Sequence, residues 1–210
     1  MSGRLRIERV VTSGVFELDG GTWEVDNNVW VVGDDDEVVV VDAAHDADPI
    51  LEAISDRDVI AVVCTHGHND HVTFAPQLAE YAYAPVLLHP GDDPLWQLTH
   101  PGEPYWPLHD QQRIGIAGTE IHVLHAPGHS PGSVCLHLPE ADTLFSGDTL
   151  FSGGPGATGR SFSDFPTIIG SIRDRLLTLP EHTRVYTGHG DDTTIGTEAP
   201  HLSEWIARGY

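Results

Sequence analysis

Residues 65–71 of the chain read Thr-His-Gly-His-Asn-Asp-His, with four metal-binding side chains in the last six positions. The stretch follows a β-branched run that is typical of a buried strand. If the extended geometry continues, His66 and His68 project to the same side and bind one cation together. Asp70 and His71 follow where the chain turns into a helix, and adjacent side chains there point in different directions. Two pairs aimed at two points predict two metal ions.

Three further candidate ligands each come directly after a predicted strand. His129 lies in a turn of glycine and proline residues at 126–133, and Asp148 and His189 each follow a glycine. Small residues let the backbone bend and approach a metal closely. Taken singly, the three residues also fit a turn-stabilising aspartate and two exposed loop histidines. Together with residues 65–71 they favour a metal centre.

The composition predicts one folded domain that does not bind nucleic acid. At 210 residues the chain is long enough for a large core, and we expect a single domain over residues 1–210. Ten Lys+Arg against 32 Asp+Glu give a formal net charge of -22, which repels phosphate backbones and anionic lipid heads. All ten basic residues are arginines, so lysine-based covalent chemistry is excluded.

Cellular context follows from what the sequence lacks. No segment approaches the roughly 20 apolar residues of a membrane span, and the N-terminal residues contain no hydrophobic core of signal-peptide length. Cys64 and Cys135 each sit in an apolar run, where a small buried thiol is the default. We therefore expect a cytoplasmic protein without a disulfide framework or a membrane partner.

Apolar periodicity predicts strands that flank helices twice over. Strands are predicted at 6–11, 15–18, 28–32, 38–42, 59–64, 86–88, 113–116, 120–125, 133–138, 143–146 and 184–186, with helices at 48–57, 75–83, 166–179 and 199–208. Residues 90–107 hold five prolines and little periodicity, which indicates a long ordered loop. Its aromatic residues either line a pocket or pack over the edge of the core. The repeated pattern predicts two stacked β-sheets with helices outside.

In order along the chain, His-x-His-x-Asp-His followed by His129, Asp148 and His189 resembles the metallo-β-lactamase fold superfamily. The resemblance covers nearly the whole chain. It implies an α/β fold, a four-layer αββα sandwich, with the site at one edge between the two sheets. The implied ligands form two sets with one shared residue: His66, His68 and His129 for one metal, Asp70, His71 and His189 for the other, and Asp148 as the bridge. Asp42, at the end of a β-branched run, is expected to accept an N–H from a ligand.

Within this superfamily the turns at 126–133 and 146–151 are similar to glyoxalase II, the hydroxyacylglutathione hydrolases. Arg160 and the following Asp164-Phe165 are similar to a loop of short bacterial members. Zinc β-lactamases of the commonest type carry cysteine where this chain has Asp148, and nucleases of the superfamily have a basic surface. Only 21 residues follow His189, too few for the helical domain that supplies glutathione contacts in full-length glyoxalase II.

We therefore expect hydrolysis of an acyl thioester of a small cellular thiol by a metal-bound hydroxide. The thiol is glutathione or, as a lysine-free chain from a GC-rich genome suggests, mycothiol. Asp70 would orient the hydroxide, and Arg160 would hold a substrate carboxylate or carbonyl unless it forms a surface ion pair. Nitrogen and carboxylate ligands favour two zinc ions, with iron or manganese as alternatives.

Other activities fit the same motifs. Persulfide dioxygenases share the histidine motif and use one iron held by two histidines and an aspartate, but their Gly-Arg-x-Asp-Phe sequence is interrupted here by Phe162 and Ser163. A lactonase or another hydrolase of the same fold is a further alternative. A non-catalytic metal-binding protein is the third, although an open two-metal site is reactive by nature.

Overall fold

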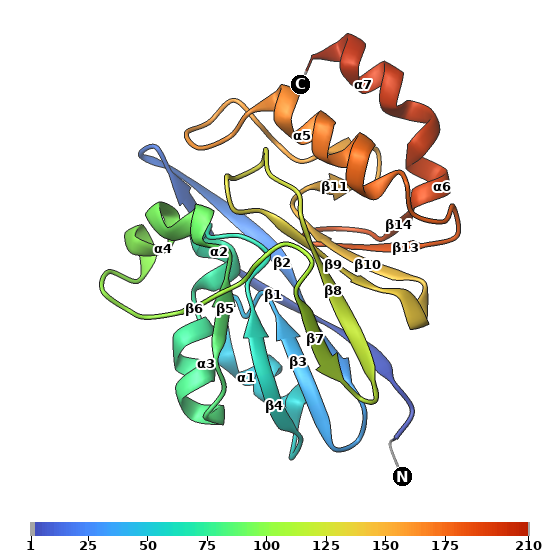
Figure 1. Ribbon diagram of the computed structural model, residues 1–210. Coiled ribbons are helices and arrows are strands. Elements are labelled where there is room, and N and C mark those ends of the chain that lie inside the picture. The colour runs from blue at the N-terminus through green and yellow to red at the C-terminus, as the bar shows by residue number, and fades with distance from the viewer. Residues whose placement is uncertain (1–2, 210) are drawn as a thin grey trace.

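Two six-stranded sheets lie face to face, with helices on both outer faces, in the computed structural model, which describes residues 3–209 (Figure 1). The first sheet runs in the order β1 (Arg6–Leu18), β2 (Gly21–Gly33), β3 (Glu37–Val41), β4 (Asp58–Val63), β5 (Val86–Leu88) and β6 (Trp106–Pro107). The second runs β14 (Thr193–Thr194), β13 (Arg184–Thr187), β10 (Thr143–Gly147), β9 (Val134–Leu138), β8 (Thr119–His125) and β7 (Arg113–Ile116). The expected αββα sandwich is confirmed.

The helices divide between the two outer faces (Figure 1). Against the first sheet lie α1 (Ala47–Ile54), α2 (Asn69–Val72), α3 (Ala75–Ala82) and α4 (Asp93–Thr99), the last preceded by the 3-10 turn Pro90–Asp92. Against the second lie α5 (Phe165–Ser171), the π-helical turn Ile172–Leu176, α6 (Ile195–Glu198), the 3-10 turn Ala199–His201 and α7 (Leu202–Arg208). A 3-10 turn at Pro139–Ala141 and the small hairpin β11 (Leu150–Phe151) and β12 (Gly154–Pro155) complete the described fold. None of the described helices has the length and apolar character needed to cross a membrane.

The valine run of β3 explains why the sheets stack. Val38 and Val40 pack beneath the helices of the first face, whereas Val39 and Val41 pack between the sheets. Side chains alternate along a strand, so a strand covered on both faces must be apolar throughout. Each fully buried valine contributes about 1.5 to 3 kcal/mol relative to an exposed one.

The N-terminal hairpin differs from the prediction of short separate strands. β1 and β2 pair without interruption from Arg6 with Gly33 to Leu18 with Gly21, so residues 12–14 and 21–27 are also strand. Polar residues such as Ser13 and Asp26 interrupt the apolar pattern but pair in register across the hairpin. Their backbone hydrogen bonds come from the partner strand, which local periodicity does not report.

The segment 90–107 was wrongly predicted as a loop throughout. It contains a 3-10 turn, α4 and the two-residue strand β6. Trp96 of α4 is fully buried, and its indole N–H donates to the carbonyl of Glu103 at 2.9 Å. Of the two interpretations for its aromatic residues, packing holds for Trp96, and tertiary burial stabilises a helix that is too short to show a clear period.

Helix ends also differ from the predicted boundaries. α1 stops at Ile54 because Ser55 has a positive φ of 56° and its N–H bonds to the carbonyl of Leu51. The long helix after Phe165 ends at Leu176 and changes to π geometry in its last turn. Cys64 and Cys135 are buried and unpaired, as expected.

Candidate metal centre

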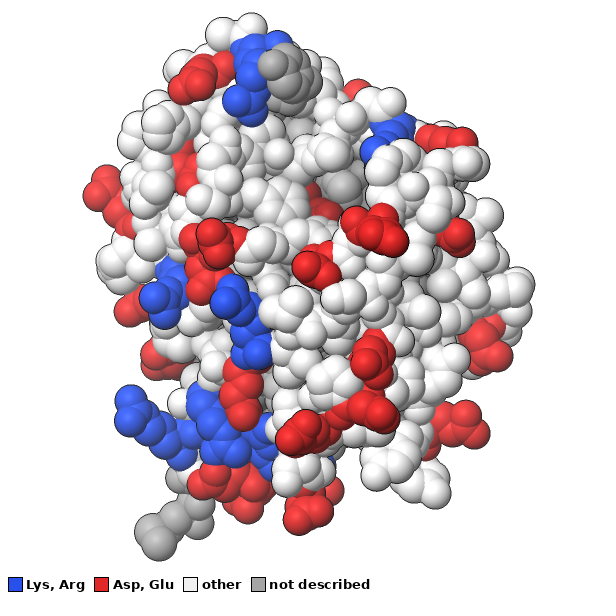
Figure 2. Space-filling model, turned by 180° about the vertical axis from the view of Figure 1, so that it is seen from behind, with Lys and Arg blue, Asp and Glu red and all other residues white. Residues whose placement is uncertain are grey.

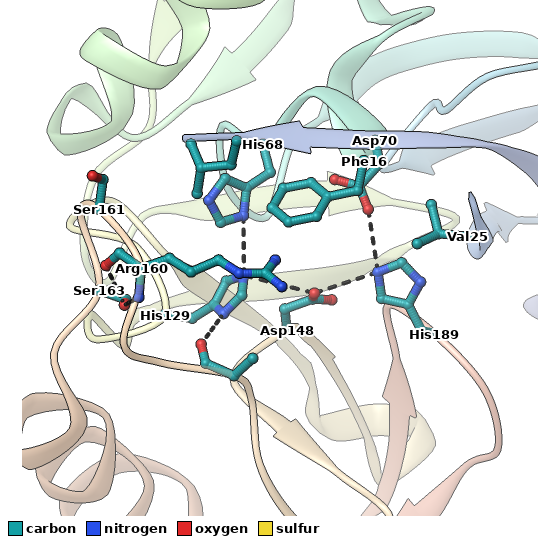
Figure 3. Close-up of a pocket in the computed structure, with 12 residues that line it drawn as sticks. Phe16, Val25, His68, Asp70, His129, Asp148, Arg160, Ser161, Ser163 and His189 are labelled. Carbon is teal, nitrogen blue, oxygen red and sulfur yellow. Dashed lines mark hydrogen bonds and ion pairs between the residues drawn. The ribbon is translucent and has the colours of Figure 1, made fainter. Parts of the chain in front are cut away.

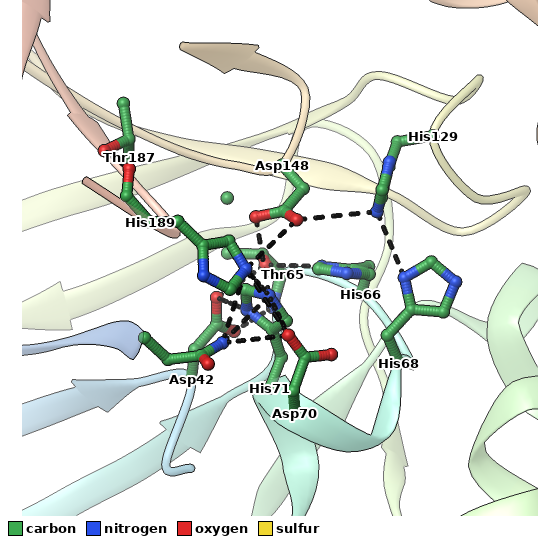
Figure 4. A network of polar contacts seen from close by, with 12 residues as sticks. Asp42, Thr65, His66, His68, Asp70, His71, His129, Asp148, Thr187 and His189 are labelled. Atoms are coloured by element: carbon green, nitrogen blue, oxygen red, sulfur yellow. Dashed lines mark hydrogen bonds and ion pairs between the residues drawn. The ribbon is translucent and has the colours of Figure 1, made fainter. Parts of the chain in front are cut away.

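All seven candidate ligands come together at one edge of the sandwich, between the sheets, and each follows the C-terminal end of a strand (Figure 4). The first motif follows β4, His129 follows β8, Asp148 follows β10 and His189 follows β13. Strand β4 ends at Val63, so His66 and His68 converge through a loop and not through continued strand geometry. The position between the two sheets is the one that the resemblance implies.

The first cluster consists of His66, His68 and His129. One ring nitrogen from each lies within 4.8 Å of the others. The Nε2 of His129 is 3.0 Å from the Nδ1 of His68. The Nε2 of His66 is buried and has no hydrogen-bond partner among the described residues. An orphaned buried nitrogen beside two converging imidazoles fits a cation.

The second cluster consists of Asp70, His71 and His189. The two imidazole Nε2 atoms are 3.1 Å apart, and the Oδ2 of Asp70 lies 3.5 Å from that of His71 and 3.4 Å from that of His189. Although Asp70 and His71 are adjacent at the start of α2, both side chains reach this one cluster. The four side chains of the motif therefore divide between the two clusters.

Asp148 lies between the two clusters (Figure 4). Its Oδ1 is 3.4 Å from the Nε2 of His71, and its Oδ2 is 3.6 Å from the Nε2 of His129 and 3.4 Å from that of His189. Oδ2 thus faces one histidine of each cluster and Oδ1 faces a second histidine of the second cluster, which suits a carboxylate shared by two cations.

Hydrogen bonds on the far sides of the rings fix which nitrogens are free to bind a metal. The Nδ1–H of His71 donates to Asp42 at 2.9 Å, that of His189 to the carbonyl of Asp26 at 2.7 Å, and that of His129 to the carbonyl of Ala157 at 2.9 Å. Carboxylates and carbonyls only accept, so in the neutral form of each ring Nε2 carries the lone pair that faces the centre. Lone pairs 3.1 Å apart repel unless a cation lies between them.

The electrostatics of the second cluster also favour positive charge. Burial lowers the pKa of His189, but Asp148 and Asp70 outweigh it and raise the pKa to about 10. Burial raises the pKa of Asp70, but the charge of His71 and the hydrogen bond and charge of His189 lower it to about 2. In the first cluster, burial and then the charge of His129 lower the pKa of His68 to about 3. Carboxylates that attract protons this strongly will also attract divalent cations, which compete with protons for the same nitrogens.

Three residues support the centre from outside the ligand set: Asp42, which the sequence predicts, and Asn27 and Asp92, which it does not. The expectation for Asp42 is confirmed, because it accepts from His71 and from both the backbone N–H and hydroxyl of Thr65. Asp42 therefore supports the second cluster through His71. Asn27 and Asp92, both fully buried, also contact the centre or its loops. Neither stands in a motif that the sequence made recognisable.

A cavity of about 140 Å³ opens onto both clusters (Figure 3). Its apolar wall includes Phe16, Leu18 and Val25 from the N-terminal hairpin. Arg160 lines the same cavity, with its guanidinium carbon 3.9 Å from the ring centroid of Trp23. No ion pair in the described part of the chain includes Arg160. The surface ion pair considered for it is therefore not formed.

Three curated relatives show the range of similar proteins. An uncharacterised 11.5 kDa protein of the thcD 3′ region of Rhodococcus erythropolis is 42% identical over 160 residues, covering 76% of this chain and 91% of the relative. The probable metallo-hydrolase YqgX of Bacillus subtilis is 33% identical, with 78% and 85% covered. The hydroxyacylglutathione hydrolase GloC of Haemophilus influenzae is 29% identical, with 79% and 85% covered.

Solved structures agree with the fold. TTHA1623 in a di-iron-bound form is 35% identical, with a TM-score of 0.76 and 83% of this chain and 93% of that chain covered. The B3 metallo-β-lactamase BLEG-1 is 30% identical, with a TM-score of 0.74 and 91% and 98% covered. A family model, the metallo-beta-lactamase superfamily, matches residues 22–189, a span that contains all seven candidate ligands. The chain therefore belongs to the metallo-β-lactamase superfamily.

Proposed function

We propose that the chain, as a single domain, is a two-metal hydrolase that cleaves the acyl thioester of a small cellular thiol. The observation that carries the two-metal part is Asp148, whose carboxylate faces His129 of the first cluster and both His71 and His189 of the second. The similarity to the metallo-hydrolase YqgX supports hydrolysis, and the similarity to the hydroxyacylglutathione hydrolase GloC supports a thioester.

The proposed ligands are those brought together by the fold: His66, His68 and His129 for the first ion, Asp70, His71 and His189 for the second, and Asp148 for both. We propose zinc, since imidazole and carboxylate suit it. Iron is the first alternative, supported by the di-iron-bound TTHA1623, and manganese is the second. When bound, two such ions lower the pKa of water so that it attacks at neutral pH, and they polarise the substrate carbonyl.

Asp70 has a second role in this proposal. While its Oδ2 faces the two imidazoles of the second cluster, its Oδ1 is buried and has no hydrogen-bond partner among the described residues. An unpaired buried acceptor is costly unless it is used. We assign Oδ1 to accept a hydrogen from the attacking water, which orients the water towards the carbonyl carbon.

The proposed reaction needs no general acid, because of the chemistry of its leaving group. A thiol with a pKa near 8.5 departs as the thiolate without a strong proton donor. No serine or cysteine nucleophile is required either, and both cysteines are buried.

The cavity suggests what the substrate looks like. About 140 Å³ beside Phe16, Leu18 and Val25 accommodates a small acyl group. The planar donors of Arg160 at the rim would bind a carboxylate of the thiol part, and stacking on Trp23 leaves those donors free. Glutathione and mycothiol conjugates are the two substrates that we propose to compare.

The test combines elemental analysis of the purified protein with hydrolysis of S-lactoylglutathione and of the matching mycothiol thioester. About two zinc-like ions per chain together with thioester hydrolysis is the expected result. A single iron, no hydrolysis and oxygen consumption with a persulfide would contradict the proposal in favour of a dioxygenase. Turnover of a lactone alone would retain the hydrolase and reject the thioester.

Hydrolysis of β-lactams is a second candidate, favoured by the 30% identity to BLEG-1 over 91% of this chain. The same metal-loaded protein should therefore be tested with a chromogenic cephalosporin. Rapid cephalosporin turnover without thioester hydrolysis would replace the first proposal by this one.

A further inference from the structure

We propose that the two clusters are positioned by separate buried residues, Asp92 for the first and Asn27 with His45 for the second. The inference rests on the proposed two-metal site and extends it to residues outside the ligand set. Its consequence is that each metal affinity can be changed through its own support, although both clusters share Asp148.

Asp92 contacts both loops that carry the first cluster. Its Oδ2 accepts the backbone N–H of Gly67 at 2.7 Å and the hydroxyl of Ser130 at 2.6 Å, and its Oδ1 accepts the N–H of Gly132 at 2.5 Å. Gly67 lies between His66 and His68, and Ser130 follows the third histidine. One carboxylate therefore fixes the backbone beside all three imidazoles of this cluster.

The two glycines make this contact sterically possible. A Cβ added to Gly132 would lie 2.6 Å from the backbone nitrogen of Asp92 and 2.7 Å from its Cγ. One added to Gly67 would meet the Cβ of Asp92 at 3.0 Å. The fully buried carboxylate is thus enclosed by backbone, and a buried charge with three donors holds its surroundings rigidly.

Asn27, within β2, contacts the ligating atoms of the second cluster. Its Nδ2 lies 3.1 Å from the Oδ2 of Asp70, 3.2 Å from the Nε2 of His71 and 3.5 Å from the Nε2 of His189, so one amide holds these three atoms close together. Because a carboxylate only accepts, the amide nitrogen must face Asp70 and the amide oxygen must face away. Asn27 does not line the cavity, so it positions ligands and does not touch substrate.

His45 fixes the orientation of that amide. Its Nε2 lies 2.9 Å from the Oδ1 of Asn27, where an N–H donates to the oxygen. His45 has a positive φ of 56°, an uncommon conformation for a residue with a side chain. Gly14 provides the space, because a Cβ there would lie 2.1 Å from the Nδ1 of His45. The positive φ of His45 and the absence of a Cβ at Gly14 therefore allow the contact between His45 and Asn27.

The two supports share no contact among the described residues. The hydrogen bonds of Asp92 go to Gly67, Ser130 and Gly132, whereas those of Asn27 go to the second cluster and His45. Partners of metal ligands affect affinity by about 10- to 100-fold. Asp92 should therefore change the affinity for the ion of the first cluster only, and Asn27 with His45 that for the ion of the second only.

The test measures zinc binding by calorimetry in backgrounds that keep one cluster. His189→Ala retains the first cluster, and His129→Ala retains the second. Asp92→Asn should weaken zinc binding about 10- to 100-fold in the His189→Ala background and leave it unchanged in the other, because the new amide NH₂ faces a backbone N–H. Asn27→Ala should do the reverse, so each variant is the control for the other.

Gly132→Ala and Gly14→Ala provide independent variants that displace Asp92 and His45 without removing them. They should reproduce the two selective effects in weaker form. Equal weakening of both clusters by either support variant would indicate general loss of structure and overturn the inference alone. A wild-type chain that binds a single zinc ion would overturn the two-metal proposal together with it.

Discussion

At the scale of single residues, Asp148 joins two clusters that each draw ligands from both sheets. Gly188 leaves room for it, since a Cβ there would lie 2.2 Å from its Oδ1 and 2.8 Å from the Cε1 of His71. The carboxylate is largely enclosed, and the charges of His189 and His71 outweigh its burial and hold its pKa well below the usual value. It therefore stays ionised and available to cations across the physiological pH range.

Replacing Asp148 by alanine should remove at least one metal ion per chain and reduce hydrolysis at least 100-fold. The reason is that both clusters lose their shared carboxylate, so less negative charge remains to balance the two cations. Elemental analysis after dialysis and steady-state kinetics measure the two effects. Full occupancy with full activity in this variant would reject the bridging role.

Gly188→Ala offers a milder perturbation of the same carboxylate, with Gly115→Ala as its control. A Cβ at Gly115 meets nothing within 4 Å, so that variant should keep wild-type metal content. Gly188→Ala should lower the metal content per chain although every ligand is still present, because the added Cβ displaces the carboxylate of Asp148.

Arg160→Gln should discriminate between substrates that differ only in charge. The same acyl group is attached to N-acetylcysteine, which carries a carboxylate, or to N-acetylcysteamine, which is neutral. A charge-assisted hydrogen bond contributes about 1.5 to 3 kcal/mol, so KM for the anionic thioester should rise about tenfold or more. KM for the neutral one should stay the same.

The exposed Arg113, which pairs with Glu120 at 2.8 Å, supplies the matched control as Arg113→Gln. Figure 2 shows that acidic side chains are scattered over the face opposite the view of Figure 1, with arginines close to them. If Arg160→Gln affected both thioesters equally, its role would be structural and not recognition of a carboxylate.

At the scale of elements, α4 shows how a segment without a clear pattern acquires structure. Trp96 buries its ring in the core beneath the helices of the first sheet, and His100 at the helix end bonds to the carbonyl of Val72 in α2 at 2.9 Å. Because α2 carries the candidate ligands Asp70 and His71, this contact links α4 to the metal centre. The 3-10 turn before α4 supplies Asp92, so the same segment also supports the first cluster.

Trp96→Ala should lower the free energy of unfolding by about 3 to 5 kcal/mol, the usual cost of truncating a large buried side chain. Urea unfolding followed by circular dichroism measures the change. Leu98 lies in the same helix but is 68% exposed, so Leu98→Ala is the control and should cost less than about 0.5 kcal/mol. A small effect of Trp96→Ala would mean that α4 is held by its ends and not by its core contact.

At the scale of the whole molecule, the two sheets must stay stacked for the clusters to form. The histidine pair His89 and His125 crosses between them, one after β5 and the other at the end of β8, with ring centroids 4.1 Å apart. Burial, followed by the charges of His125 and His109, lowers the pKa of His89 to about 4. The Nδ1 of His89 also accepts the N–H of Gly91 at 3.1 Å, which requires this nitrogen to be unprotonated.

Stability should fall as the pH is lowered from about 6.5 to 4, in part because of His89. In this window the unfolded chain binds a proton at an ordinary histidine whereas the folded chain does not, so acid favours unfolding. His89→Gln should reduce the loss by about 1 kcal/mol or less, because His89 is only half-buried and its charge is screened by solvent. Denaturant unfolding at pH 7 and pH 4.5 checks this, and identical pH profiles for variant and wild type would reject it.

The sequence alone determined which residues have metal-ligand chemistry, because spacing, glycine turns and residue type are local properties. Residues 65–71, His129, Asp148 and His189 were all recognisable from their own neighbours, and the buried strands were recognisable from β-branched runs such as that of β3. The stacked sheets also followed, since strands flanked by helices twice over have few ways to bury both faces.

Only the tertiary structure decided which groups support that chemistry and where the chain departs from local pattern. Asp92 and Asn27 act on residues 25 to 162 positions away, and no local pattern records such contacts. The continuous β1–β2 hairpin and the α4 helix depend on a partner strand and on a buried tryptophan. In each case the stabilising free energy comes from surfaces and hydrogen bonds that exist only once distant parts of the chain meet.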